Sequence, residues 1–131
     1  MTGGMWRARL TAAVVALVIL VAGLAVRLLL PAGAFSQNAG TALYAALIYA
    51  GVVVVAPAVR PITAGLVAVG FCWAVELLQL TPVPSHLSDR SLIARLVLGA
   101  HFDPADMIWY PVGVLTLVAA HLIVRRPGQT V

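Results

Sequence analysis

The stretch LTAAVVALVILVAGLAVRLLL, residues 10–30, decides the class of fold. It contains one charged residue, Arg27, and it ends before Pro31. A helix that crosses a bilayer needs about 20 predominantly apolar residues, so this stretch predicts a membrane-spanning helix. The whole chain agrees, because 63% of its 131 residues are hydrophobic and 9% are charged, against about 45–50% and 25% in soluble domains. The composition predicts an integral membrane protein.

Apolar runs of this kind follow one another along the chain, at about residues 10–30, 39–56, 62–80 and 106–124. Pro57 stops the second run, and the prolines of TPVP, residues 81–84, stop the third, because proline cannot continue a helix. Short connections take up the remaining residues and leave no room for a second domain. We therefore expect an all-α fold, a four-helix membrane bundle that forms a single domain over residues 1–131.

The one long connection, residues 81–105, holds most of the polar residues. Inside it lies SDRSLIARLVLG, residues 88–99, which begins with Ser88, a helix-capping residue type, and ends with Gly99, a common stop signal. Its apolar residues recur at helical spacing. We expect a short amphipathic helix that lies at the membrane interface between the third and fourth spans.

The N-terminus has an alternative interpretation. Arg7 and Arg9, the apolar run after them and AGA at residues 32–34 together resemble a cleaved signal peptide. The apolar run is longer than the 7–15 residues that are typical of such a segment, which favours a retained first helix.

The arginines predict the orientation in the membrane. Four spans place both termini and the link between the second and third spans on one side, and that side carries Arg7, Arg9, Arg60, Arg125 and Arg126. The other side carries Arg27, Arg90 and Arg95. Because cytoplasmic segments carry an excess of basic residues, we expect a multi-pass protein of the cell membrane with both termini cytoplasmic and residues 81–105 outside.

Polar side chains occur at a similar depth near the outer ends of three spans, and they are Arg27, Glu76, Gln79 and Asp106. A charge at the bilayer centre costs about 2.5–3.5 kcal/mol on insertion scales, so such side chains usually face the bundle interior and pair. We expect an ion pair between Arg27 and Glu76, extended by Gln79 on the same helical face. Two alternatives stay open: the pair only holds the first and third helices in register, or Arg27 snorkels to the interface.

The segment DPAD, residues 103–106, is typical of a helix start. Asp103 suits the capping position, Pro104 suits the first helical position, and Asp106 lies near the positive end of the helix dipole. Tyr110 follows Asp106 by one turn. It either joins an outer belt of aromatic residues or turns inward toward Glu76, and the sequence leaves both open.

Several classes of ligand are disfavoured by the sequence. Cys72 is the single cysteine, so there is no intrachain disulfide and no cysteine metal set. The metal-capable residues of the loop fit no compact ligand motif, and they are His86, Asp89, His101 and Asp103. We expect neither a metal nor a cofactor. Nucleic acid is also disfavoured, because the arginines are scattered and form no basic stripe.

An anionic lipid headgroup is the ligand that the arginines favour. Arg90 and Arg95 of the loop, beside Arg27, have the guanidinium geometry that grips a phosphate with two hydrogen bonds. Membrane lipids are therefore the expected partners, with a membrane protein as the alternative.

These residues also carry a resemblance to a known family. The segments involved are GLAVR at residues 23–27, AGTALYAALIY at 39–49, ELLQL at 76–80 and RLVLGAHFDPADMIWYPVG at 95–113. In these segments the chain resembles DUF2809, a family of small bacterial membrane proteins of unknown function, which is similar in turn to the VanZ-like proteins. VanZ-like proteins are associated with teicoplanin resistance and, more loosely, with the cell envelope, so the resemblance implies a location in the envelope and no mechanism. Family members often carry an aspartate where this chain has Thr41, which puts a proton or metal role at that position in doubt.

Two functions remain. In the first, the chain is a non-enzymatic envelope protein with an outward polar pocket, in which Arg27, Arg90 and Arg95 grip an anionic headgroup or a partner protein, while Glu76 and Asp106 orient it. In the second, Glu76 is the acid or base of a small proton-coupled transporter or a lipid-modifying enzyme. No activated serine or cysteine nucleophile and no phosphate-binding loop is recognisable in the sequence, which disfavours an enzyme. A transporter of four helices would call for a homo-oligomer.

Overall fold

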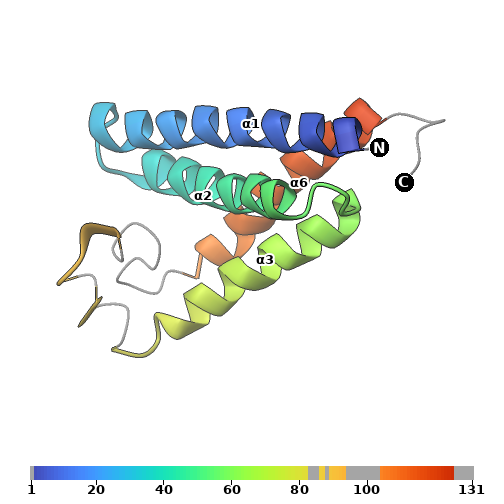
Figure 1. Cartoon of the computed structure of the whole chain (residues 1–131). Coiled ribbons are helices and arrows are strands. Elements are labelled where there is room, and N and C mark those ends of the chain that lie inside the picture. The colour runs from blue at the N-terminus through green and yellow to red at the C-terminus, as the bar shows by residue number, and fades with distance from the viewer. Residues whose placement is uncertain (1, 83–85, 88, 94–103, 126–131) are drawn as a thin grey trace.

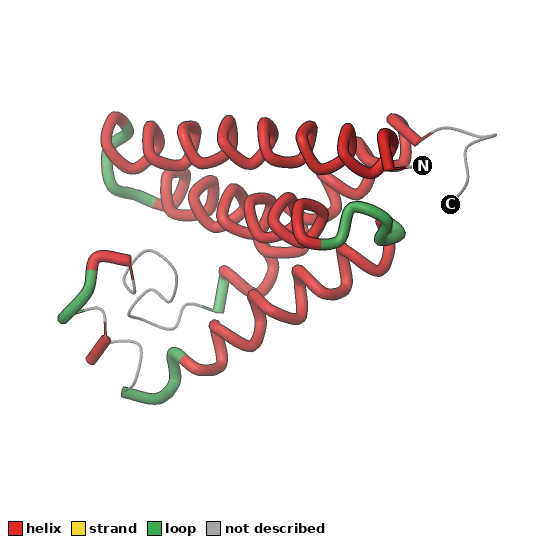
Figure 2. Tube along the Cα trace, in the orientation of Figure 1, coloured by secondary structure: helices red, strands yellow, loops and turns green. Residues whose placement is uncertain are grey.

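The fold of the chain is an all-α bundle of long helices. The computed structural model describes residues 2–82, 86–87, 89–93 and 104–125. Its helices are α1 (Thr2–Leu29), α2 (Ala34–Val55), α3 (Pro61–Leu78) and α6 (Asp106–Arg125). Figure 2 shows helices, loops and turns in this part of the chain. All four helices are long and apolar enough to cross a membrane, so the predicted fold is confirmed and the chain is a multi-pass membrane protein.

Proline residues set several of the helix ends. α1 ends at Leu29, two residues before Pro31, because a proline disfavours the helical conformation in the residue before it. Pro61 occupies the first position of α3 and follows Arg60, whose backbone is extended. A proline is tolerated there, because the first N–H groups of a helix have no partner within it. α1 and α2 begin earlier than the hydropathy pattern predicts, since that pattern reports the buried length of a span and not the helix end.

The helices alternate in direction from α1 to α2 to α3 and then to α6, so the start of α1 and the end of α6 lie at the same end of the bundle (Figure 1). α2, α3 and α6 pack together, and α1 lies against α2 on the side away from α3. Small side chains line the α2 and α3 faces of the core, where Ala45, Ala64 and Ala68 are fully buried. Small residues let helices approach closely in a membrane, where van der Waals contact is the main attraction.

Large apolar side chains cover the outer surface of the bundle. On α1, Val14, Leu17 and Val21 each expose more than half of their surface. Lipid tails are as apolar as these side chains, so their exposure is stable in a bilayer. α1 therefore presents most of its surface to lipid.

α2 and α6 approach each other closely at Gly113. A Cβ atom at this position would overlap the carbonyl oxygen of Ala42 and would lie 2.8 Å from the Ala42 carbonyl carbon. A side chain at Gly65 of α3 would be less restricted, since its Cβ would meet a methyl group of Val118 at 2.9 Å. The two helix crossings therefore depend on the absence of a side chain, most strongly at Gly113.

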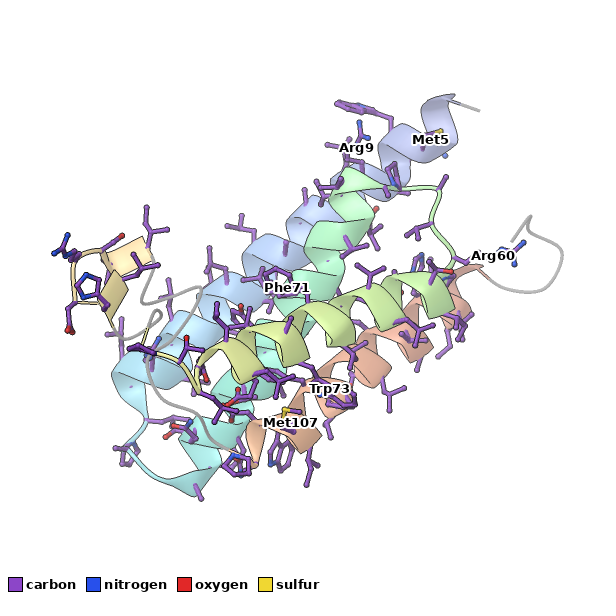
Figure 3. All side chains as sticks on the ribbon, turned by 90° about the horizontal axis from the view of Figure 1, so that it is seen from below. Met5, Arg9, Arg60, Phe71, Trp73 and Met107 are labelled. Atoms are coloured by element: carbon purple, nitrogen blue, oxygen red, sulfur yellow. The ribbon has the colours of Figure 1, made fainter. Side chains whose placement is uncertain are left out.

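Arg9 of α1 caps the C-terminal end of α2. Its Nε donates a hydrogen bond of 2.8 Å to the carbonyl oxygen of Val54, and its guanidinium lies 5.9 Å from the ring centre of Trp6. The last carbonyls of a helix have no partner within it, and the negative end of its dipole attracts a cation. Figure 3 shows Arg9 at the end of the bundle where α2 finishes.

We expect Arg9→Met to lower the free energy of unfolding by about 1 kcal/mol, because the apolar stem remains while the Val54 carbonyl loses its donor. Unfolding of the purified protein in mixed detergent micelles measures the change. Arg7→Met is the matched control, since Arg7 is exposed on the same helix. An equal loss in the Arg7 variant would contradict the assignment of Arg9 as a cap.

Candidate functional site

Glu76 lies at the centre of the α2, α3 and α6 interface and has no exposed surface. It shares one face of α3 with Cys72, one turn earlier, which is also fully buried. The hydroxyl of Tyr110 on α6 donates a hydrogen bond of 2.8 Å to Glu76 Oε1. Tyr110 exposes 4% of its surface. The two orientations left open for Tyr110 are thereby resolved, because its side chain points inward and not to the membrane surface.

A second buried pair joins α2 to α6. Thr41 and Asp106 are both buried, and 2.8 Å separates Thr41 Oγ1 from Asp106 Oδ1. The Thr41 hydroxyl also lies 3.0 Å from the carbonyl oxygen of Gln37, one turn earlier on α2. Such bonding to the preceding turn is common for threonine inside a helix. It holds the Thr41 side chain toward α6.

The two pairs form one site, because Asp106 and Tyr110 are one turn apart on the same face of α6. We call Thr41, Glu76, Asp106 and Tyr110 the acid–hydroxyl cluster. The ring of Tyr44 on α2 packs 6.1 Å from the ring of Tyr110 and covers it on the α2 side. The cluster therefore lies where α2, α3 and α6 meet, near the end of the bundle at which α3 finishes and α6 begins (Figure 1).

The local sequence explains how each side chain reaches this site. Asp106 is the first residue of α6, where the helix dipole stabilises a negative charge. Gln79 is the C-terminal capping residue of α3, and it lies half-buried one turn beyond Glu76. Glu76, Asp106 and Tyr110 therefore come together from the end of α3 and the start of α6.

The predicted ion pair between Arg27 and Glu76 is wrong. Both residues lie in the described part of the chain, where Arg27 is exposed and makes no ion pair with the fully buried Glu76. The physical reason is the position of α1, which packs on the side of α2 away from α3. A long arginine side chain near a helix end extends to the polar interface instead of entering the bundle. Of the two alternatives, snorkelling is the one that fits.

The loop residues are only partly within the described segments. Arg90, His86 and Asp89 are exposed. Arg95, His101 and Asp103 lie outside the described residues, as do Ser88 and residues 94–99 of the predicted interfacial helix. Across the described segments, no three histidine, cysteine or acidic side chains are grouped to hold a metal ion.

A further polar contact lies at the opposite end of the α2 and α6 seam. Tyr49 OH and His121 Nδ1 are 2.6 Å apart, and the two rings meet edge to face at 5.9 Å. The sequence gives no signal for this pair beyond the polarity of His121 in an apolar helix. Thr41 and Trp73 are likewise residues whose contacts the sequence does not predict, because both depend on how the helices are rotated.

A four-helix bundle of membrane-spanning length defines a multi-pass membrane protein, and the buried acids of α3 and α6 form a polar site inside this bundle together with hydroxyl groups of α2 and α6. Residues 30–114 match the family described as Protein of unknown function (DUF2809), and the chain belongs to this family. The matched segment contains the whole acid–hydroxyl cluster and Gly113, whereas Arg27 lies before it. Comparison with curated proteins gave no match, and comparison with solved structures gave none.

Proposed function

We propose that the chain is a non-enzymatic protein of the bacterial cell membrane that binds an anionic lipid headgroup at the outer end of its bundle. The observation that carries this proposal is the acid–hydroxyl cluster, which lies at the same end of the bundle as the exposed Arg27 near the end of α1. Both termini are then cytoplasmic, in accord with the basic residues at that end, where Figure 3 places Arg9 and Arg60. The resemblance to VanZ-like proteins supports a place in the envelope.

The arginine and the carboxylate side chains bind different parts of the headgroup. Arg27 and Arg90 are exposed and bind its phosphate, since a guanidinium offers two parallel donors to phosphate oxygens. Glu76 and Asp106 accept hydrogen bonds from its hydroxyl or ammonium groups. Arg27 thus keeps its expected ligand contact although it does not pair with Glu76. Arg95 is the third arginine of the proposed grip.

Native mass spectrometry of the purified protein tests this function. We expect an anionic phospholipid to remain bound, and we expect the double variant Arg27→Gln, Arg90→Gln to reduce the lipid-bound fraction several-fold. Arg60→Gln is the matched control, because Arg60 is exposed at the opposite end of the bundle. Absence of bound lipid across several detergents would refute the proposal, as would an equal loss in the Arg60 variant. A co-purifying protein in place of lipid would favour a partner protein as the ligand.

One observation favours a second candidate, in which Glu76 is the acid or base of a proton-coupled transporter or a lipid-modifying enzyme. Glu76 is fully buried and accepts a hydrogen bond from a phenol, and ionisable groups inside a membrane are often functional. Glu76→Gln separates the two candidates, because it keeps an acceptor for Tyr110 and removes the carboxyl group that would act as the acid or base. Loss of the cellular phenotype at a normal protein level and normal lipid binding would favour the acid–base role.

A further inference from the structure

Pro111 interrupts the hydrogen bonding of α6 one turn after the helix begins. In a regular helix the N–H of residue 111 would donate to the carbonyl of Met107, four residues earlier. Proline has no N–H, and its ring also displaces that carbonyl. Lipid tails offer no donor to replace the lost bond, so a carbonyl that faces lipid without a partner is costly.

The indole of Trp73 supplies the missing donor from the neighbouring helix. Its Nε1 donates a hydrogen bond of 3.1 Å to the carbonyl oxygen of Met107. Figure 3 shows Trp73 on α3 beside Met107. The side chain of Trp73 is 41% exposed, so the bond lies at the outer surface of the seam between α3 and α6.

This bond attaches the first turn of α6, which carries two members of the acid–hydroxyl cluster, to α3. Residues 106–110 include Asp106 and Tyr110, on either side of Met107. Trp73 and Glu76 lie three positions apart on α3, so both hold this turn, one through a backbone carbonyl and one through the Tyr110 hydroxyl. On the α2 side Thr41 holds Asp106.

We propose that Trp73 is a positioning residue whose indole N–H latches the first turn of α6 onto α3, and so aligns Asp106 with Thr41 and Tyr110 with Glu76. Pro111 follows this turn and interrupts the backbone hydrogen bonds that would join it to the rest of α6. When the bond between Trp73 and Met107 breaks, the turn therefore separates from α3 as a unit. Opening then gives a ligand access to the buried acids. This last step rests on the proposed binding function, whereas the position of the turn is tested independently of any ligand.

The native Cys72 reports the opening of the seam. It is fully buried one position before Trp73 and one turn before Glu76, so separation of the first turn of α6 from α3 is expected to increase the access of a small uncharged disulfide, such as 4,4′-dithiodipyridine, to its thiol. We expect Trp73→Phe, which keeps an aromatic ring and loses the N–H, to raise the labelling rate about threefold. That factor corresponds to the roughly 0.6 kcal/mol of an average side-chain hydrogen bond within a membrane.

Pro111→Ala provides the decisive rescue. It gives residue 111 an N–H that pairs with the Met107 carbonyl, so the first turn is joined to the rest of α6 and no longer separates as a unit. We expect the double variant Trp73→Phe, Pro111→Ala to be labelled at the rate of the parent protein. An unchanged rate in Trp73→Phe would overturn the latch, and so would a double variant as fast as Trp73→Phe, because packing would then be the cause. Rescue in a protein that retains no lipid would leave the latch established and would count against the headgroup function alone.

Discussion

Gly113→Ala is expected to force α6 away from α2 and to lower the free energy of unfolding by about 3 kcal/mol, at the upper end of the usual cost of overpacking. The added methyl group would overlap the backbone of Ala42, and a backbone atom cannot move aside as the end of a side chain can. Helix separation would also lengthen the contact between Thr41 and Asp106. Steric-trapping or detergent unfolding measurements on the purified protein test this expectation.

Substitutions of two other glycines give a graded comparison for the loss of stability in Gly113→Ala. Gly65→Ala meets only a methyl group of Val118 and is expected to cost about 1 kcal/mol. Gly70→Ala meets nothing within 4 Å, and is expected to be neutral or slightly stabilising, because alanine favours the helix over glycine. A Gly113 variant no less stable than the Gly70 variant would show that α2 and α6 do not cross at this point.

Glu76→Ala is expected to lower the free energy of unfolding by about 3 kcal/mol. The substitution leaves the buried Tyr110 hydroxyl without the acceptor it has at 2.8 Å, at a cost of about 1–3 kcal/mol, and it leaves a cavity in a packed interior. Glu76→Gln keeps both the volume and an acceptor oxygen, so its expected loss is below about 1 kcal/mol. Unfolding in mixed micelles compares the two variants.

A double-mutant cycle assigns the loss to the pair. Tyr110→Phe removes the donor, so adding it to Glu76→Ala is expected to cost less than its effect on the parent protein, because no hydroxyl is then left without a partner. Strict additivity would mean that the hydrogen bond between Tyr110 and Glu76 contributes nothing. Equal losses in Glu76→Gln and Glu76→Ala would mean that the negative charge, and not the acceptor, stabilises the bundle.

The spans were predictable because each is a long apolar run, and hydropathy along the chain is sufficient to find it. The depth of Glu76 and Asp106 was predictable for the same reason, since the number of residues from a helix end fixes the height in the bundle. Rotation about the helix axis was not predictable. In a membrane all sides of a helix are apolar, so the sequence carries little information about which side faces a neighbour.

The error at Arg27 has this origin. It lies at the same end of the bundle as Glu76, and only the packing of α1 on the far side of α2 separates the two side chains. The orientation of Tyr110 and the partner of Thr41 depend on rotation in the same way. The contact of Trp73 could not be predicted from the sequence for a second reason. Pro111 predicts that the Met107 carbonyl loses its donor, but the donor that replaces it, the Trp73 indole, comes from another helix.

Hydrogen bonds at both ends of the seam between α2 and α6 restrict how the bundle can change shape. Thr41 meets Asp106 near the end at which α6 begins, and Tyr49 meets His121 toward the end at which α6 finishes. The two contacts together oppose sliding of α2 along α6, because each hydrogen bond would have to break. The contact at Asp106 belongs to the turn before Pro111 and the contact at His121 to the helix after it, so each part of α6 keeps its own attachment to α2 when the first turn leaves α3.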